Sequence, residues 1–252
     1  RVLFRSKPFN IDEPTQRRGT GSYKWESADA DVIPLWVADM DFRTAPCIIE
    51  ALSDRVRHGV FGYEKVPDAW YEALQGWFAR RHGWQIRREE VLCTTGVVPA
   101  VSAVIKAFTR PGDGVALMTP AYNCFFSSIR NNGCFAAETS LLMGDAGWTI
   151  DFAALEKTLA DPRVKVLLFC SPHNPVGRVW TADEIRRTAQ IAHQAGVLFV
   201  CDEIHGEFVF GGNRYLPAAQ VEGVDPLRTV ILTSPTKRSE EHTSELQSLY
   251  LI

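Results

Sequence analysis

Residues 164–177 read VKVLLFCSPHNPVG, an apolar run of strand length that is followed at once by a turn. A nearly unbroken run of branched and aromatic residues is typical of a strand buried on both faces. Asn174, Pro175 and Gly177 are turn residues, so we expect the strand to end at Cys170. This pattern predicts an interior strand of a mainly parallel sheet.

Five other runs of similar composition predict further strands, and amphipathic stripes between them predict helices. The expected strands are 91–95, 115–119, 134–139, 197–202 and 229–233. The expected helices lie over 46–58, 70–82 and 97–108, and from a capping box at Thr181 and Glu184 to Gly196. Strands that alternate with helices predict βαβ units, and hence an α/β fold with a mainly parallel sheet flanked by helices.

Composition limits the classes of function. The 252 residues carry 27 Lys and Arg against 30 Asp and Glu, and this balance gives no basic surface for nucleic acid or anionic lipid. No apolar run approaches the ~20 residues of a membrane helix. The six cysteines form no paired motif, so we expect buried thiols in a reducing cytoplasm and no metal site. We therefore expect a soluble cytoplasmic protein without a nucleic-acid or membrane partner.

Ligands of open α/β sheets bind beyond the carboxyl ends of strands, so these ends hold the candidate site residues. They are Gly96, Val97, Val98, Tyr122, Asn174, Asp202, His205, Ser234 and Lys237. Each of several residues, considered by itself, also has a purely structural explanation. Gly96 and Asn174 could simply form turns, Tyr122 could pack in the core, Asp202 could cap the following segment, and Lys237 could be a solvated surface charge. The functional interpretation depends on all of these residues lying together at strand ends.

A pyridoxal 5′-phosphate site needs these groups together. Its aldehyde needs an amine, here Lys237, and its pyridine nitrogen needs a carboxylate, here Asp202. An amide and an aromatic ring fix the plane of the cofactor, which suits Asn174 and Tyr122. The phosphate needs the N–H groups of a helix N-terminus and a hydroxyl, which residues 96–98 and Ser234 would provide.

The motifs Ser-Pro-x-Asn-Pro-x-Gly (171–177), Asp-Glu-x-His (202–205) and Ser-x-x-Lys (234–237) resemble those of fold-type I pyridoxal-phosphate enzymes, the aminotransferase class I/II superfamily. A closer likeness is to the MalY/PatB-type cystathionine β-lyases, or cysteine-S-conjugate β-lyases. The stretches that carry it are RGTGSYKW (18–25), WVADMDF (36–42), APCIIEAL (45–52), GVFGY (59–63), SPHNPVGRVW (171–180) and CDEIHGEFVF (201–210).

This resemblance implies a homodimeric lyase that acts on a small amino-acid substrate. Cystathionine or another cysteine S-conjugate would be cleaved by α,β-elimination to a thiol, pyruvate and ammonia. The resemblance places Tyr63 across the dimer interface at the neighbour's phosphate, His205 near the phenolate oxygen, and 36–39 near the substrate channel. An aminotransferase shares every named residue and is the main alternative. A non-catalytic pyridoxal-phosphate-binding regulator is a further one.

The resemblance also implies a division of the chain. Residues 1–45 are expected to form an N-terminal arm and part of a small domain, and 46–237 an incomplete large cofactor-binding domain. Residues 238–252 depart from the family pattern and look like translated read-through sequence, so we expect them to be foreign. The next strand of the family, which lies between the first and last strands found here, would be missing, as would the arginine for the substrate carboxylate. We therefore expect these 252 residues alone to be poorly soluble or inactive.

Overall fold

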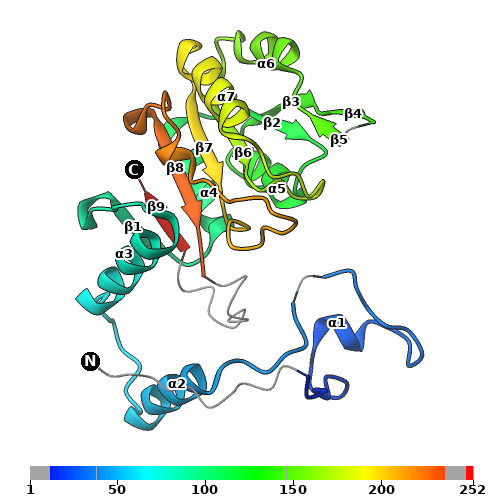
Figure 1. Cartoon of the computed structure of the whole chain (residues 1–252), viewed down its shortest axis with the longest axis vertical. Helices are drawn as coiled ribbons and strands as arrows, with labels where there is room; N and C mark the ends of the chain where they lie inside the picture. Colours follow the sequence, from blue (N-terminus) through cyan, green and yellow to red (C-terminus); the bar gives the residue numbers. More distant parts are fainter. Residues whose placement is uncertain (1–11, 38, 146, 236–247, 252) are drawn as a thin grey trace. The chain divides into compact units, whose positions relative to one another are not determined.

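The computed structural model describes residues 12–37, 39–145, 147–235 and 248–251 (Figure 1). The chain divides into two compact units, which meet in sequence at Val66 and Pro67. Helix α2 (Pro46–His58), which the sequence assigns to the larger domain, thus groups with the N-terminal residues. The expected division into domains stays a prediction.

A sheet forms the centre of the second unit. Its described strands lie in the order β1-β9-β8-β7-β6-β2-β3. Their bounds are β1 (Val91–Thr94), β2 (Gly114–Thr119), β3 (Phe135–Ser140), β6 (Val164–Cys170), β7 (Leu198–Asp202), β8 (Thr229–Thr233) and β9 (Ser248–Leu251). The strands from β8 to β3 are parallel, and β9 is antiparallel to both β1 and β8. The mainly parallel sheet is confirmed, and each of the six expected strands begins and ends within one residue of its prediction.

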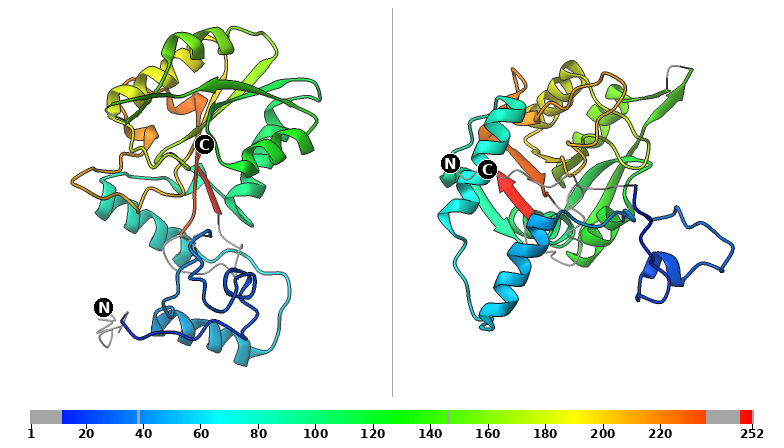
Figure 2. Two further views of the ribbon diagram at one scale, coloured as in Figure 1. Left: turned by 90° about the vertical axis from the view of Figure 1, so that its right-hand side faces the viewer. Right: turned by 60° about the horizontal axis from the view of Figure 1, so that its bottom comes forward.

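Helices cover both faces of the sheet (Figures 1 and 2). They are α3 (Asp68–His82), α4 (Val97–Phe108), α5 (Asn123–Asn131), α6 (Phe152–Leu159) and α7 (Ala182–Gln194), with short turns η1 (Arg88–Glu90), η2 (Ala218–Gln220) and η3 (Pro226–Arg228). Alternate residues of β6 serve the two faces: Leu167 and Phe169 pack with α6 and α7, whereas Val166 and Leu168 pack with α4 and α5. This burial on both faces explains the apolar run from Val166 to Cys170.

Three elements of this unit escaped the sequence analysis. They are α5, α6, and a hairpin of β4 (Leu142–Gly144) and β5 (Gly147–Thr149). The residues of β4 are all exposed, so this strand has no buried face to mark it by apolar alternation. Helix α6 does carry a start signal, because the carboxylate of Asp151 accepts a hydrogen bond from the backbone N–H of Ala154.

The position between β1 and β8 was expected to lack a strand, and that expectation is wrong. Strand β9 lies there, with the backbone of Tyr250 opposite Leu92 on one side and Leu232 on the other. The physical reason is that both neighbouring strands offer backbone donors and acceptors, and an extended segment from any part of the chain can pair with them. The foreign origin of 238–252 stays a prediction.

The first unit has no apolar core among its described residues. Of the residues of this unit that the structure describes, only Lys24 and Pro34 are buried. Its helices are α1 (Tyr23–Glu26) and α2, and no residue of α2 is buried. Its large exposed apolar residues are Tyr23, Val32, Ile33, Leu35, Trp36, Phe42, Ile49, Leu52, Val56, Val60, Phe61 and Tyr63. Polar contacts, not apolar packing, therefore determine the local structure of this unit.

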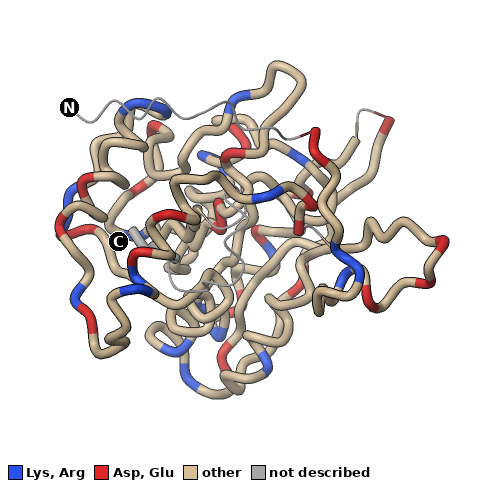
Figure 3. Tube along the Cα trace, turned by 90° about the horizontal axis from the view of Figure 1, so that it is seen from below, with Lys and Arg blue, Asp and Glu red and all other residues tan. Residues whose placement is uncertain are grey.

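Charges of both signs are interspersed along the trace (Figure 3). In the described part of the chain, no helix is both long enough and apolar enough to cross a bilayer.

Candidate functional site

The five strands of the second unit that lead to predicted ligands end at one edge of the sheet. Strands β2, β6, β7 and β8 are parallel, and β1 shares their direction because β9 is antiparallel to both β1 and β8. The predicted ligands follow these ends: 96–98 after β1, Tyr122 after β2, Asn174 after β6, Asp202 at the end of β7 and Ser234 after β8. The topology therefore brings them to the edge at which α/β sheets bind ligands.

Tyr122 follows β2 and precedes the first residue of α5. Its ring packs edge-on against Phe125, with 5.9 Å between centroids. Burial raises the pKa of Tyr122 to about 12, with further contributions from Cys124 and the Asp202 carboxylate. The phenol therefore stays neutral at physiological pH, and its ring offers a surface for stacking.

The thiol of Cys170 organises the turn after β6. It donates to the carbonyl of Pro172 at 3.2 Å and accepts from the backbone N–H of Asn174 at 3.4 Å. Complete burial raises the pKa of Cys170 far above its usual value, so it stays a thiol. A buried, neutral group thus fixes the backbone from which the Asn174 side chain extends.

Asp202 ends β7 and is only 5% exposed. Its carbonyl accepts from the backbone N–H of Ser171 at 2.9 Å, which joins this strand end to the turn after β6. One carboxylate oxygen accepts from the backbone N–H of Ile204 at 3.0 Å. The carboxylate therefore also caps the turn that holds His205, as the purely structural explanation of Asp202 anticipated.

Glu203 is a second buried carboxyl group, which the sequence analysis did not select. It is 1% exposed and accepts hydrogen bonds from the Tyr215 hydroxyl and, at 2.7 Å, from the backbone N–H of Ala218. Burial raises the pKa of Glu203 to about 7, although these hydrogen bonds lower it in part. The available signal was the Asp-Glu pair in the sequence, in which Glu203 directly follows the last residue of β7.

The N-terminus of α4 is open. Gly96 precedes it with φ 151° and ψ 160°, a conformation that side-chain-bearing residues rarely adopt, and no side chain caps this helix. The first N–H groups of a helix have no acceptor within it, so those of Val97 and Val98 are suited to an anion. Ser234 is buried beyond β8, and Lys237 lies outside the described residues.

The other site predictions fall in the first unit. Tyr63 is fully exposed there, and Trp36 is exposed with its ring edge-on to Tyr23 at 5.2 Å between centroids. Their roles stay predictions.

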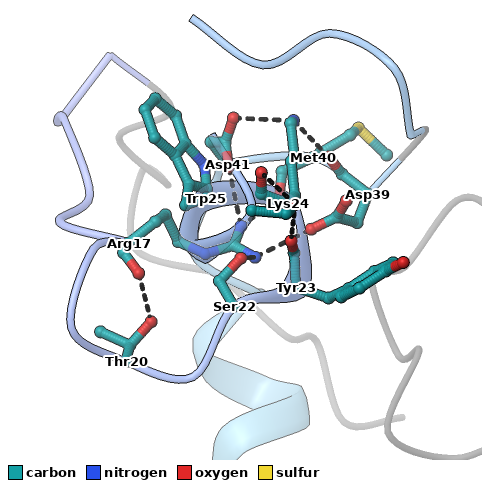
Figure 4. A network of polar contacts seen from close by, with 10 residues as sticks. Arg17, Thr20, Ser22, Tyr23, Lys24, Trp25, Asp39, Met40 and Asp41 are labelled. Carbon is teal, nitrogen blue, oxygen red and sulfur yellow. Dashed lines mark hydrogen bonds and ion pairs between the residues drawn. The ribbon is translucent and has the colours of Figure 1, made fainter. Parts of the chain in front are cut away.

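A polar network holds the segment after Trp36 (Figure 4). The guanidinium of Arg17 binds Asp39 and Asp41 at 2.8 Å each, and the buried Lys24 amine binds Asp41 at 3.0 Å. The Trp25 indole N–H donates to Asp41 at 2.7 Å. Burial acts to raise the pKa of Asp41, but the contacts with Trp25, Lys24 and Arg17 outweigh it and hold that pKa below its usual value.

Arg18 holds the loop of residues 25–32, which precedes Trp36 in the chain. Its guanidinium donates to four backbone carbonyls, those of Trp25, Ala28, Asp29 and Val32, at 2.7–3.1 Å. Two neighbouring arginines therefore fix this part of the first unit.

Residues 30–238 match the sequence profile of the family described as aminotransferase class I and II. The chain belongs to this family. It is 37% identical over 234 residues to cystathionine beta-lyase PatB of Bacillus subtilis, and 38% identical over 235 residues to protein MalY of Escherichia coli. Each alignment covers 91% of this chain and 60% of the relative.

Solved structures give the same result for the fold. The structure of cystalysin from Treponema denticola, which contains pyridoxal 5′-phosphate, superposes with a TM-score of 0.90 at 34% identity. It is matched over 98% of this chain and 64% of its own. A pyridoxal-phosphate-bound C-S lyase from Staphylococcus hominis gives a TM-score of 0.89 at 26% identity. The expected fold-type I architecture is confirmed, and the chain spans less than two thirds of the length of these relatives.

Membership of the aminotransferase class I and II family agrees with the motifs that predicted it. Four strand-end positions from the sequence, at Tyr122, Asn174, Asp202 and Ser234, lie at one edge of the sheet with the α4 N-terminus. Which of these side chains bind a cofactor stays a prediction.

Proposed function

We propose that the protein is a pyridoxal 5′-phosphate-dependent carbon–sulfur β-lyase, which cleaves cystathionine or cysteine S-conjugates to a thiol, pyruvate and ammonia. One observation carries the proposal: Asp202, Tyr122, Asn174 and the α4 N-terminus lie at strand ends on one edge of the sheet, in a family member whose relatives include named cystathionine β-lyases. Those names favour the lyase over the aminotransferase and over a non-catalytic regulator.

The donor set fits the cofactor chemically. The uncapped first turn of α4 suits a phosphate dianion, because N–H groups and the helix dipole both favour negative charge there. Asp202 is an almost fully buried carboxylate, which suits a cationic pyridine nitrogen in a site of low dielectric. The neutral ring of Tyr122 suits stacking.

Each residue then has a defined task. Asp202 holds the proton on the pyridine nitrogen, Tyr122 and Asn174 orient the ring, and Ser234 binds the phosphate together with residues 96–98. When bound, pyridoxal phosphate supplies the electron-accepting ring that stabilises negative charge at the substrate Cα. Lys237 removes the Cα proton as general base, which allows the thiolate to leave from Cβ.

The remaining roles concern the assembled protein. We propose a homodimer in which Tyr63 of each copy binds the other copy's cofactor phosphate and His205 lies near the phenolate oxygen. The exposure of Tyr63 supports this proposal. The six cysteines are free thiols, which supports a cytoplasmic location.

The test uses the protein as its gene encodes it, purified with pyridoxal phosphate and given L-cystathionine. We expect pyruvate and a free thiol to form in equal amounts, and Lys237→Ala to abolish both. Formation of a keto acid from the amino donor without release of thiol would identify an aminotransferase instead. Normal turnover in Lys237→Ala would refute the assignment of the base.

A further inference from the structure

The sheet separates at the carboxyl ends of β2 and β6. Their pairing ends at Leu117 and Leu168, whereas β2 stays paired with β3 to Thr119, and β6 with β7 to Cys170. The chain also changes direction here: β2 leads to β3 on one side, and β6 leads to β7 on the other. The loops with Tyr122 and Asn174 thus leave from opposite sides of this split.

One side chain joins the two loops. The imidazole Nε2 of His173 lies 2.9 Å from the carbonyl oxygen of Pro120, a residue 53 positions earlier in the chain. Pro120 is two residues before Tyr122, and His173 is directly before Asn174. Since a carbonyl oxygen can only accept, we assign the proton of the neutral ring to Nε2.

The His173 ring is held in place. It is 4% exposed and lies edge-on to Trp180, with 5.7 Å between centroids and 87° between planes. Its own backbone is fixed on both sides, because its N–H donates to Arg178 and its carbonyl accepts from Gly177, each at 2.8 Å. Burial lowers the pKa of His173, and the carbonyls of Pro120 and Cys170 offset this only in part. The ring is therefore a neutral, rigid link.

We propose that His173 is a positioning residue, whose Nε2–H bond to Pro120 sets the separation of the two loops so that Tyr122 and Asn174 contact the same bound cofactor. This inference rests on the proposed pyridoxal-phosphate site. His173 itself touches neither cofactor nor substrate and acts through its neighbours.

Two substitutions separate the bond from the bulk of the ring. His173→Phe keeps a ring against Trp180 and removes the donor, whereas the amide of His173→Gln can restore a donor near the position of Nε2. Loss of one buried hydrogen bond should raise the dissociation constant for pyridoxal phosphate roughly tenfold. We expect this loss in His173→Phe, with weaker visible circular dichroism of the bound cofactor, and values within about threefold of wild type in His173→Gln.

His193 provides a matched control. It is also a histidine with a burial-lowered pKa, its Nε2 lies 3.3 Å from the carbonyl of Arg228, and its ring is edge-on to Phe199. Arg228 precedes the first residue of β8, at the opposite edge of the sheet. His193→Phe should lower thermal stability without changing the affinity for pyridoxal phosphate or its dichroism.

Three results would overturn the inference: unchanged affinity and dichroism in His173→Phe, equal losses in His193→Phe, or a folded His173→Gln as impaired as His173→Phe. If His173→Phe does not fold, nitrogen NMR of the wild-type imidazole decides, since a proton on Nδ1 instead of Nε2 contradicts the bond to Pro120. A wild-type protein that binds no pyridoxal phosphate would instead refute the proposed function.

Discussion

Glu203 gives the chain a defined dependence of stability on pH. Its pKa is about 7 in the folded protein, against an ordinary value of 4.5 for an exposed glutamate. A group whose folded pKa is raised contributes stability that is complete below pH 4.5 and is lost as the pH rises through 7. The difference of about 2.5 units corresponds to roughly 3 kcal/mol of unfolding free energy.

The perturbation is Glu203→Gln. The amide stays neutral at every pH, can accept from the Ala218 N–H, and can donate to the Tyr215 hydroxyl in place of accepting from it. Urea unfolding of both proteins, free of cofactor, at pH 5 and pH 8 gives the four free energies required. We expect the wild type to lose roughly 2.5 kcal/mol more than the variant between these pH values, because a part of the effect is already lost at pH 5.

The difference between wild type and variant removes the contributions of the other titrating groups to the unfolding free energy. His173 and His193 have lowered pKa values and act in the opposite sense, but they are present in both proteins. Parallel pH profiles for the two proteins would refute the reasoning, because they would mean that Glu203 is ionised in the fold.

Substitutions at four further positions test the site, the core and a helix cap. Tyr122→Ala should weaken the binding of pyridoxal phosphate about three- to tenfold through lost ring contact, while Tyr122→Phe binds nearly as wild type, as measured by cofactor titration. Asp202→Asn should lower kcat at least about a hundredfold, and a change of less than twofold would remove this residue from the mechanism. Phe169→Ala, at a fully buried position, should cost about 3–5 kcal/mol in urea unfolding. Thr181→Ala removes the N-cap of α7 and should cost about 1 kcal/mol, and an unchanged unfolding midpoint would contradict the capping box with Glu184.

The strands of the second unit were predictable because burial on both faces requires short runs of apolar residues, which are visible in the sequence. Strand β6 carries such a run from Val166 to Cys170, and its boundaries match the prediction. Strand β9 could not be placed, because its partners β1 and β8 are distant in sequence and its pairing depends on their backbones rather than on its own residues.

Some site residues were likewise predictable from the sequence and others were not. Asp202 and Tyr122 were found because a strand end is visible in the sequence. The tasks of Glu203 and His173 were not, since each depends on one distant partner, Tyr215 or Pro120, that no local pattern identifies. The sequence can place a residue at the edge of the sheet, but a hydrogen-bond partner that is distant in sequence is identified only from the three-dimensional structure.

The contacts of Arg18 have a consequence for how this protein can vary. All four of its acceptors are main-chain oxygens, which every amino acid supplies. The side chains of Trp25, Ala28, Asp29 and Val32 can therefore change without removing a single acceptor of that guanidinium. Among relatives, Arg18 should therefore be retained while the side chains at positions 28, 29 and 32 vary, because these positions contribute only main-chain oxygens to its contacts.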